Sequence, residues 1–144
     1  MLTVKIVCVG TLKESYWRDA CAEYEKRLSA FCKLKIVALP ESTLSREKSE
    51  ILKECEGFVV ALCVEGKPMT SEALAEKIAS VSQISSKITF VIGSSCGLDP
   101  EVKQRADLKL SFSSFTFPHQ MMRVLLLEVL YRSFSILKGT KYHK

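Results

Sequence analysis

Short apolar runs alternate with longer amphipathic stretches along the whole chain. Each apolar run has five to seven residues, and most are closed by glycine, proline or another turn-forming residue. Runs of this length and boundary are typical of buried strands rather than helices. The sequence therefore predicts five strands, over residues 4–9, 34–39, 58–64, 88–92 and 108–113.

Between these runs, and after the last one, apolar residues recur at the three- and four-residue spacing of helices. Ser15, then Thr70 or Ser71, stand where N-caps are expected. Asp99 is a further N-cap, and Pro100 follows it at a position where a missing N–H costs nothing. The pattern predicts helices over residues 15–31, 44–56, 71–81 and 119–138, with another starting at Pro100.

Five strand–helix units in a row predict one α/β domain over residues 1–144. Such a domain has a mostly parallel sheet with helices on both faces. Ligands of these sheets bind beyond the carboxyl ends of the strands. Here those ends are residues 10, 40, 65–66, 93–97 and 113–118.

The helix expected over residues 119–138 is apolar around most of its circumference. A helix of this kind is buried on several sides, and in so small a domain the pattern favours a homodimer over burial within one chain. Glu128 and Arg132 are spaced to form an i,i+4 ion pair. Arg123 lies elsewhere, among apolar residues. It could extend out of that surface or hold an anion, and its position in the first turn favours the anion.

Composition narrows the class of protein. The 144 residues are 47% hydrophobic, which is normal for a globular domain. No apolar run is long enough to cross a membrane, and the first residues lack the pattern of a secretory leader. We therefore expect a cytoplasmic protein without a membrane partner. The six cysteines have no CxxC spacing, which indicates reduced thiols and no metal site.

Positive charge is concentrated in the last third of the chain. Residues 103–144 hold 8 Lys and Arg against 2 Asp and Glu, whereas residues 1–102 hold 13 against 14. This distribution suits a polyanionic partner contacted by the C-terminal segment, with nucleic acid first. A generic basic surface is the alternative.

The segment "GSSCG" at residues 93–97 matches the G-x-S-x-G pattern of hydrolases, with Ser95 as the nucleophile. The other triad members would be Asp99 or Asp107 and one of the two histidines, His119 or His143. However, the next helix does not begin directly after the serine, and the chain is short for that hydrolase fold. A loop that lets the backbone approach a ligand closely is the favoured interpretation.

Two further segments carry candidate chemistry. "SFSSFTFPHQMMR", residues 111–123, is either an ordinary strand-to-helix loop or a pocket for an aromatic ring such as adenine. The end of the chain, "KGTKYHK", is either a solvated terminus or an ordered tail. Its imidazole, phenol and lysines suit proton transfer beside a phosphate backbone.

Taken together, "VIGSSCGL", the long segment from "LSFSSFTFPHQMMR" to "FSILKG" and the terminal "YHK" resemble the SPOUT-class methyltransferases of the ribosomal RNA large subunit methyltransferase H type. The opening "VKIVCVGTLKESYW" is similar to the first βαβ unit of that family, so the resemblance spans essentially the whole chain. It implies a C-terminal trefoil knot and a homodimer that binds S-adenosylmethionine. The implied reaction is methylation of N3 of a pseudouridine in helix 69 of 23S rRNA, on the assembled ribosome.

The resemblance also implies site residues. The cofactor positions are Leu62, Gly93, Phe112, Ser113, Ser114, Phe115, Thr116 and Phe117. We expect His143 or Tyr142 to assist deprotonation of the base. The expected RNA contacts are Arg123, Arg132, Lys138, Lys141 and Lys144, with Arg105 and Lys109 as further candidates. The alternatives are the serine hydrolase and a non-catalytic RNA-binding α/β module.

Two departures from the family pattern stand out. Ser94 occupies a position where relatives often have a second glycine, and the segment around residues 40–58 is shorter than usual.

Overall fold

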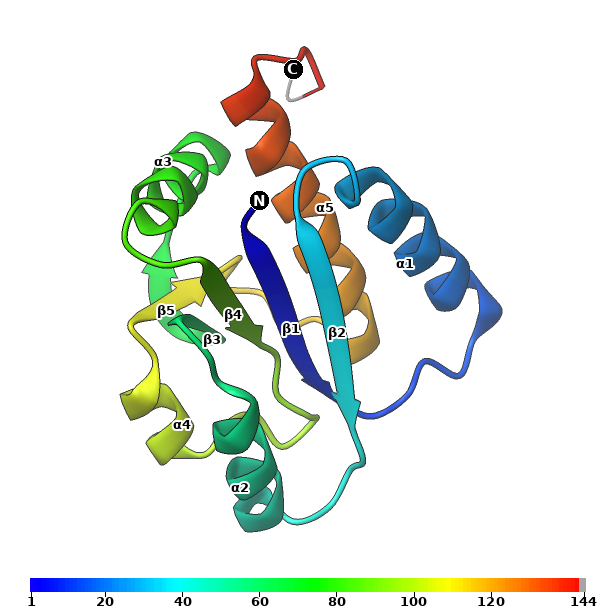
Figure 1. The fold of residues 1–144 in the computed structure, drawn as a ribbon. Helices are drawn as coiled ribbons and strands as arrows, with labels where there is room; N and C mark the ends of the chain where they lie inside the picture. The colour runs from blue at the N-terminus through cyan, green and yellow to red at the C-terminus, as the bar shows by residue number, and fades with distance from the viewer. Residues whose placement is uncertain (143–144) are drawn as a thin grey trace.

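The computed structural model describes residues 1–142, in which five strands and five helices alternate strictly along the chain (Figure 1). All ten predicted elements are confirmed, and the last helix has the predicted bounds. The largest difference is in β3, which continues to Pro68. The elements are β1 (Thr3–Val9), α1 (Ser15–Leu28), β2 (Lys33–Leu39), α2 (Leu44–Glu54), β3 (Phe58–Pro68), α3 (Ser71–Ser82), β4 (Lys87–Val91), α4 (Pro100–Arg105), β5 (Leu108–Ser111) and α5 (His119–Lys138).

The strands form one sheet in the order β2-β1-β4-β3-β5, and every pair of neighbours is parallel. Val7 pairs with Val37 on one side and Val91 on the other, and Val60 pairs with Phe90 and Leu108. The predicted parallel sheet is therefore confirmed. Because all five strands run the same way, their carboxyl ends meet at one edge of the sheet.

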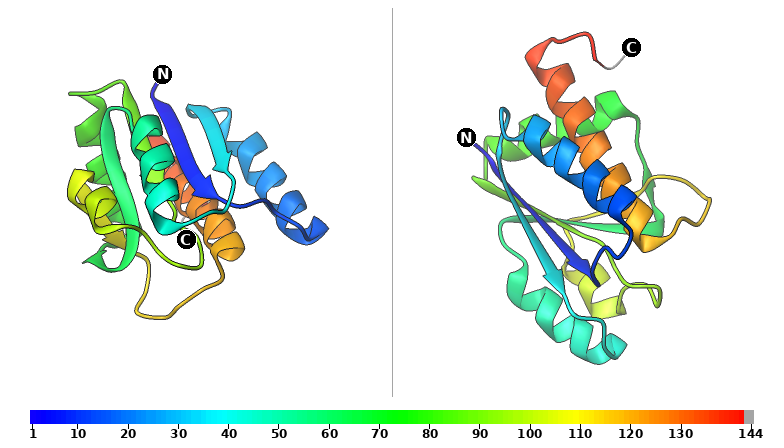
Figure 2. Two further views of the ribbon diagram at one scale, coloured as in Figure 1. Left: turned by 90° about the horizontal axis from the view of Figure 1, so that it is seen from below. Right: turned by 90° about the vertical axis from the view of Figure 1, so that its right-hand side faces the viewer.

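Helices cover both faces of the sheet, as predicted (Figure 2). Alternating residues of β1 face opposite ways, so Val4 and Ile6 contribute to one core and Val7 and Val9 to the other. The first core is covered by α1, α3 and α5, and the second by α2 and α4. Leu126, Leu127 and Leu130 of α5 are fully buried in the first core, which makes this helix a central element of the domain.

Local capping explains where several helices begin and end. Thr70 accepts a hydrogen bond from the N–H of Ala73, and Asp99 accepts one from the N–H of Glu101, so both predicted caps are confirmed. The prediction for Ser15 is wrong, because Ser15 is the first helical residue and Glu14 precedes it without a side-chain cap. Gly139 ends α5 in the left-handed conformation.

The extension of β3 beyond the predicted strand depends on Gly66. β3 pairs with β5 first through Leu62 and again through Lys67 after a shift in register, so the residues between them bulge away from the ladder. A side-chain carbon at Gly66 would lie 2.8 Å from backbone atoms of Lys109 and Leu110. Only glycine allows the chain to pass this close to β5. The bulge is thereby held over the carboxyl end of β5.

The cysteines are separate thiols, and Cys8, Cys21 and Cys32 are buried. Burial raises the pKa of the Cys21 and Cys32 thiols to about 11, so at neutral pH they behave as small apolar side chains. Within residues 1–142, no three His, Cys, Asp or Glu side chains gather as metal ligands would. In the same part of the chain, no helix has the length and apolar character needed to cross a membrane.

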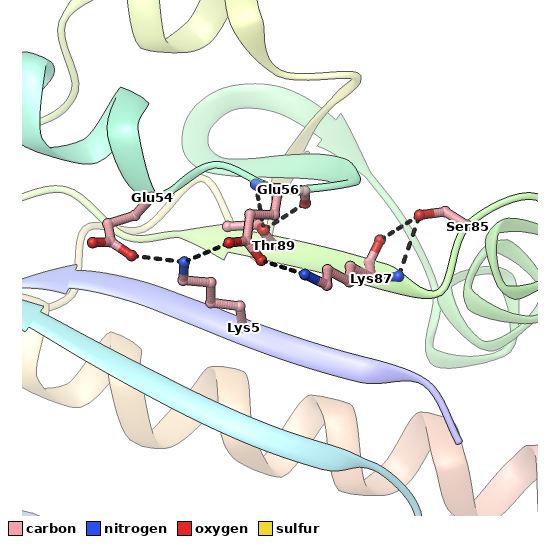
Figure 3. A network of polar contacts seen from close by, with 6 residues as sticks. All are labelled: Lys5, Glu54, Glu56, Ser85, Lys87 and Thr89. Atoms are coloured by element: carbon pink, nitrogen blue, oxygen red, sulfur yellow. Dashed lines mark hydrogen bonds and ion pairs between the residues drawn. The ribbon is translucent and has the colours of Figure 1, made fainter.

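One lysine is buried in the sheet and holds the segment between α2 and β3 (Figure 3). The ammonium of Lys5 lies 2.6 Å from a carboxylate oxygen of Glu54 and 3.6 Å from one of Glu56. Glu56 also pairs with Lys87 at 3.2 Å, and its backbone exchanges two hydrogen bonds with the Thr89 hydroxyl. This network ties the chain leaving α2 to β1 and β4.

We expect Lys5→Ala to lower the free energy of unfolding by about 2 kcal/mol, because it leaves the partly buried Glu54 carboxylate without its cation, whereas Glu56 keeps its pairing with Lys87. The matched control is Lys87→Ala, whose side chain is 50% exposed and which should cost less than about 1 kcal/mol. Urea unfolding of the two variants measures the difference. Equal losses would contradict a special role for the buried pair.

Candidate functional site

A cavity of about 290 Å³ opens at the carboxyl edge of β3, β4 and β5. Its walls come from five places: the end and bulge of β3, the loop after β4, α4 through Lys103, the end of β5 with the loop that follows it, and the first turn of α5. These segments are far apart in the sequence, and the strand order β4-β3-β5 brings them together. The cavity lies where parallel α/β sheets bind ligands.

Seven of the eight residues predicted to bind cofactor line this cavity. Leu62, at the end of the paired part of β3, is 8% exposed, and Leu110 beside it is 2% exposed. Phe115, by contrast, is 78% exposed. The cavity therefore has an apolar base and an open mouth. The seven are Leu62, Gly93, Phe112, Ser113, Phe115, Thr116 and Phe117, and Ser114 is the exception.

The glycine loop, residues 93–97, is wound tightly enough to exclude side chains at its first position. A side-chain carbon on Gly93 would lie 2.6 Å from the carbonyl oxygen of Gly97. Gly97 has φ of +81°, and its N–H donates to the carbonyl of Ser94 at 2.9 Å. The loop thus presents backbone to the cavity, as the sequence indicated.

The segment that follows β5 is a loop whose hydroxyls hold its own backbone. Ser111 donates to the carbonyl of Ser113 at 3.1 Å, and the Ser113 hydroxyl accepts from the N–H of Phe115 at 3.0 Å. Phe112 and Phe117 are half-buried and line the cavity. Of the two interpretations that the sequence left open for this segment, the geometry favours a pocket wall.

Sequence reasoning missed several residues of the site. Glu65, on the bulge of β3, forms an ion pair with Lys103 of α4 at the cavity. The hydrogen bond from Lys103 holds the pKa of the Glu65 carboxyl below its usual range. The position of Glu65 just after a strand was a usable signal. Nothing in the sequence pointed to Lys103, because its relation to the cavity depends on how α4 packs.

Among residues 1–142 the hydrolase triad is not assembled, and His143, the alternative histidine, lies outside this range. Ser95 is exposed on the glycine loop, while Asp99 caps α4 and Asp107 accepts the N–H of Val59 at 2.8 Å. His119 lies 3.6 Å from Glu41 instead, and no hydrogen bond joins it to Ser95 among residues 1–142. The two carboxylates proposed for the triad each accept a hydrogen bond from a backbone N–H instead.

Tyr142, the last residue that the structure describes, packs on the side of α5 that faces α1. Its hydroxyl donates to Glu128 at 2.7 Å, and its ring meets that of Tyr131 edge to face at 4.6 Å between centroids. The hydrogen bond to Glu128 raises the pKa of the Tyr142 phenol, and burial raises it further. The phenol is therefore protonated at neutral pH and acts as a donor. His143, the other expected catalytic residue, lies outside the described residues.

The structure describes four of the five expected RNA contacts, and they differ in exposure and in their partners. Lys138 and Lys141 are exposed, and Lys144 lies outside the described part of the chain. Arg132 makes the predicted ion pair with Glu128, at 2.8 Å, and its guanidinium also lies 5.1 Å from the Tyr142 ring.

Arg123 requires a correction. Its side chain is only 5% exposed, and its guanidinium donates to the carbonyl of Gly10 at 2.9 Å. A group this buried has almost no surface to offer a phosphate. Its position after Pro118 and His119 suggested an anion site, but the first turn of α5 faces the loop that follows β1. Arg123 holds that loop to α5.

A second hollow, of about 320 Å³, lies between α3 and α5. We call it the α3–α5 groove, and it is lined by Met69, Thr70, Ser71, Leu74, Leu110, Phe112, Ser113, Phe117, Leu125 and Val129. Phe112 and Phe117 also line the first cavity, so the two hollows share a wall. Leu125 and Val129 of α5 line this groove and are only half-buried, so the domain leaves part of the apolar surface of α5 uncovered.

The pKa of the Tyr142 phenol is higher in the folded protein than in the unfolded chain. Its hydrogen bond to Glu128 therefore contributes its full stabilisation below the ordinary phenol pKa of about 10. This contribution is lost as the pH rises through the folded-state pKa. In an absorbance titration of the four tyrosines, one should ionise last, and Tyr142→Phe should remove that step. Tyr16→Phe, at a residue 61% exposed, is the control and should leave it. A late step that survives in Tyr142→Phe would contradict this assignment.

Comparison with known proteins assigns the family. A family model described as "Predicted SPOUT methyltransferase" matches residues 2–143. A relative from Methanococcus maripaludis is 48% identical, and the ribosomal RNA large subunit methyltransferase H of Streptococcus equi subsp. zooepidemicus is 43% identical. Each match covers 99% of this chain and all of the relative.

Solved structures agree on the fold. A probable methylase family protein from Haemophilus influenzae matches with a TM-score of 0.60 at 15% identity, covering 98% of this chain and 70% of that one. TrmJ from Z. mobilis matches with a TM-score of 0.51 at 13% identity, covering 92% and 70%. The trefoil knot stays a prediction. The α/β architecture, the cavity at its strand ends and the full-length matches lead to one conclusion: this chain belongs to the SPOUT methyltransferase family, in its ribosomal RNA large subunit methyltransferase H group.

Proposed function

We propose that the protein uses S-adenosylmethionine to methylate N3 of a pseudouridine in helix 69 of 23S rRNA, on the assembled ribosome. The observation that carries this proposal is the cavity at the strand ends, because seven residues of the family motifs converge there from three separate segments. Ribosomal action would place the protein in the cytoplasm. The family assignment supports the reaction class.

The cavity suits the proposed cofactor. Its volume is close to the lower end of small-molecule sites, roughly 300–1,000 Å³. Leu62 and Leu110 form an apolar base for a ring, and the glycine loop offers backbone groups at its wall. When bound, S-adenosylmethionine would supply an electrophilic methyl group on its sulfonium. The part of the chain around the cavity would bind and orient it and exclude water.

The target nitrogen must lose a proton, and the tail is the proposed source of the acceptor. His143 is the better candidate, because an imidazole titrates near pH 6.5 and is available as a base at neutral pH. Tyr142 is protonated in its contact with Glu128, so we assign it to positioning the tail rather than accepting the proton. Lys138, Lys141 and Lys144 are the proposed phosphate contacts.

The position of the tail supports a homodimer with shared sites. The Tyr142 ring lies beside Tyr131 and Arg132, nine or more residues after Met122 in the cavity, which is at least about 14 Å along the helix axis. In Figure 1 the C-terminal end of α5 lies at the top, while β1, β2 and β4 run downward to their carboxyl ends. Two further residues add at most about 7 Å of chain. With Tyr142 in place, the tail of one copy would therefore serve the cavity of another, with the α3–α5 groove as the proposed interface.

The direct test of the function combines binding with product analysis. Calorimetry of the purified protein should give a one-to-one complex with S-adenosylmethionine, and large-subunit rRNA methylated by the protein should gain one methyl group at N3 of a pseudouridine in helix 69. The rRNA of a deletion strain should lack that methyl group, and mass spectrometry of rRNA digests measures its loss. RNA binding without any cofactor binding would instead indicate a non-catalytic RNA-binding module.

Shared sites predict complementation between two inactive variants. Deletion of Tyr142–Lys144 should abolish methylation and leave cofactor affinity intact. Gly93→Ala should abolish cofactor binding, because the new carbon would collide with the Gly97 carbonyl. Co-expressed, the two chains should recover about a quarter of the activity, since half of the dimers are mixed and each has one complete site. A mixture as inactive as its parts would contradict a tail that acts on its partner's cavity.

A further inference from the structure

One buried carboxylate of this protein has no cation to neutralise it. Glu47, in the first turn of α2, is only 3% exposed and forms no ion pair among residues 1–142. A buried charge of this kind is costly unless hydrogen bonds satisfy it. Both carboxylate oxygens of Glu47 accept such hydrogen bonds.

Each oxygen of Glu47 accepts one hydrogen bond from a different segment. Oε2 accepts from the backbone N–H of Ser42 at 2.9 Å, within the connection between β2 and α2. Oε1 accepts from the hydroxyl of Ser94 at 2.9 Å, 47 residues further along the chain. Hydrogen bonds to an ionised acceptor are roughly twice as strong as those between neutral groups. The carboxylate thus joins α2 to the loop after β4.

Ser94 also forms hydrogen bonds with other residues of the glycine loop. It is 9% exposed, and its hydroxyl also accepts from the N–H of Cys96 at 3.3 Å. Its carbonyl accepts from the N–H of Gly97 at 2.9 Å, and the two residues form an isolated bridge. One side chain, fixed by Glu47, therefore sets the turn that closes the wall of the cavity.

We propose that Glu47 is a positioning residue for the glycine loop, acting through Ser94 to hold the loop in the shape that receives the cofactor. The proposal rests on the proposed cofactor site for its functional consequence, although the loop geometry is independent of it. It gives a reason for serine at position 94, since a glycine there would have no hydroxyl to donate to Glu47.

A purely structural role predicts something different, and Thr43 offers the matched control. Thr43 caps the same helix by accepting the N–H of Arg46 at 3.2 Å, and this hydrogen bond does not involve the loop. Thr43→Ala should therefore weaken α2 without releasing residues 93–97. If Glu47 only stabilises α2, Glu47→Ala and Thr43→Ala will affect the loop alike.

The first measurement is amide hydrogen exchange of the protein without cofactor. We expect residues 93–98 to exchange about tenfold faster in Glu47→Ala, the factor that corresponds to about 1.4 kcal/mol. Thr43→Ala should leave them unchanged, and Glu47→Gln, which keeps an acceptor, should lie between. Faster exchange confined to α2 in Glu47→Ala would overturn the proposal.

The second measurement is calorimetry with S-adenosylmethionine. Glu47→Ala should weaken the affinity about tenfold more than Thr43→Ala does, and Ser94→Ala should have little further effect in the Glu47→Ala background, since the two side chains act as one unit. Additive losses would overturn the proposal. If the wild-type protein binds no cofactor but its loop exchange responds to Glu47, the proposed function fails while the positioning of the loop by Glu47 stands.

Discussion

Parallel pairing of β4, β3 and β5 is the constraint on which the site depends. These strands are separated in the sequence by helices, yet their ladders run in one direction and their carboxyl ends meet at one edge. The loops that follow these strands come from separate parts of the sequence, and they therefore converge at that edge. Gly66 adds to this by letting the β3 bulge pass against the backbone of β5, so that Glu65 and its neighbours close the cavity from above the strand end.

Helix α5 connects this edge to the opposite end of the domain. Its buried leucines fill the core under the sheet, its first turn lines the cavity, and its later turns hold Tyr142. A helix of twenty residues separates the cavity at the strand ends from Tyr142 within one chain. The same helix leaves an apolar groove against α3. A second copy seated there would cover that groove and return a tail to each cavity.

The sequence predicted the parts whose signal is local. Apolar periodicity located the strands and four of the helices, a cap and a proline located α4, and the family resemblance assigned the segment from Phe112 to Phe117 to the cofactor site. Relations between distant segments could not be predicted. Arg123 looks like an exposed anion ligand until α5 packs against the loop at Gly10. Glu47 and Ser94 stand 47 positions apart, and no periodicity links a helix residue to a loop across the sheet edge.

We propose that the cavity formed by the loops after β3, β4 and β5 holds S-adenosylmethionine. The decisive measurement is hydrogen exchange of the wild-type protein with and without this cofactor. Bound cofactor should slow exchange in residues 62–65, 93–98 and 111–118 and leave α1 unchanged. Cofactor binding that protects other segments and leaves the glycine loop and residues 111–118 unchanged would contradict this proposal.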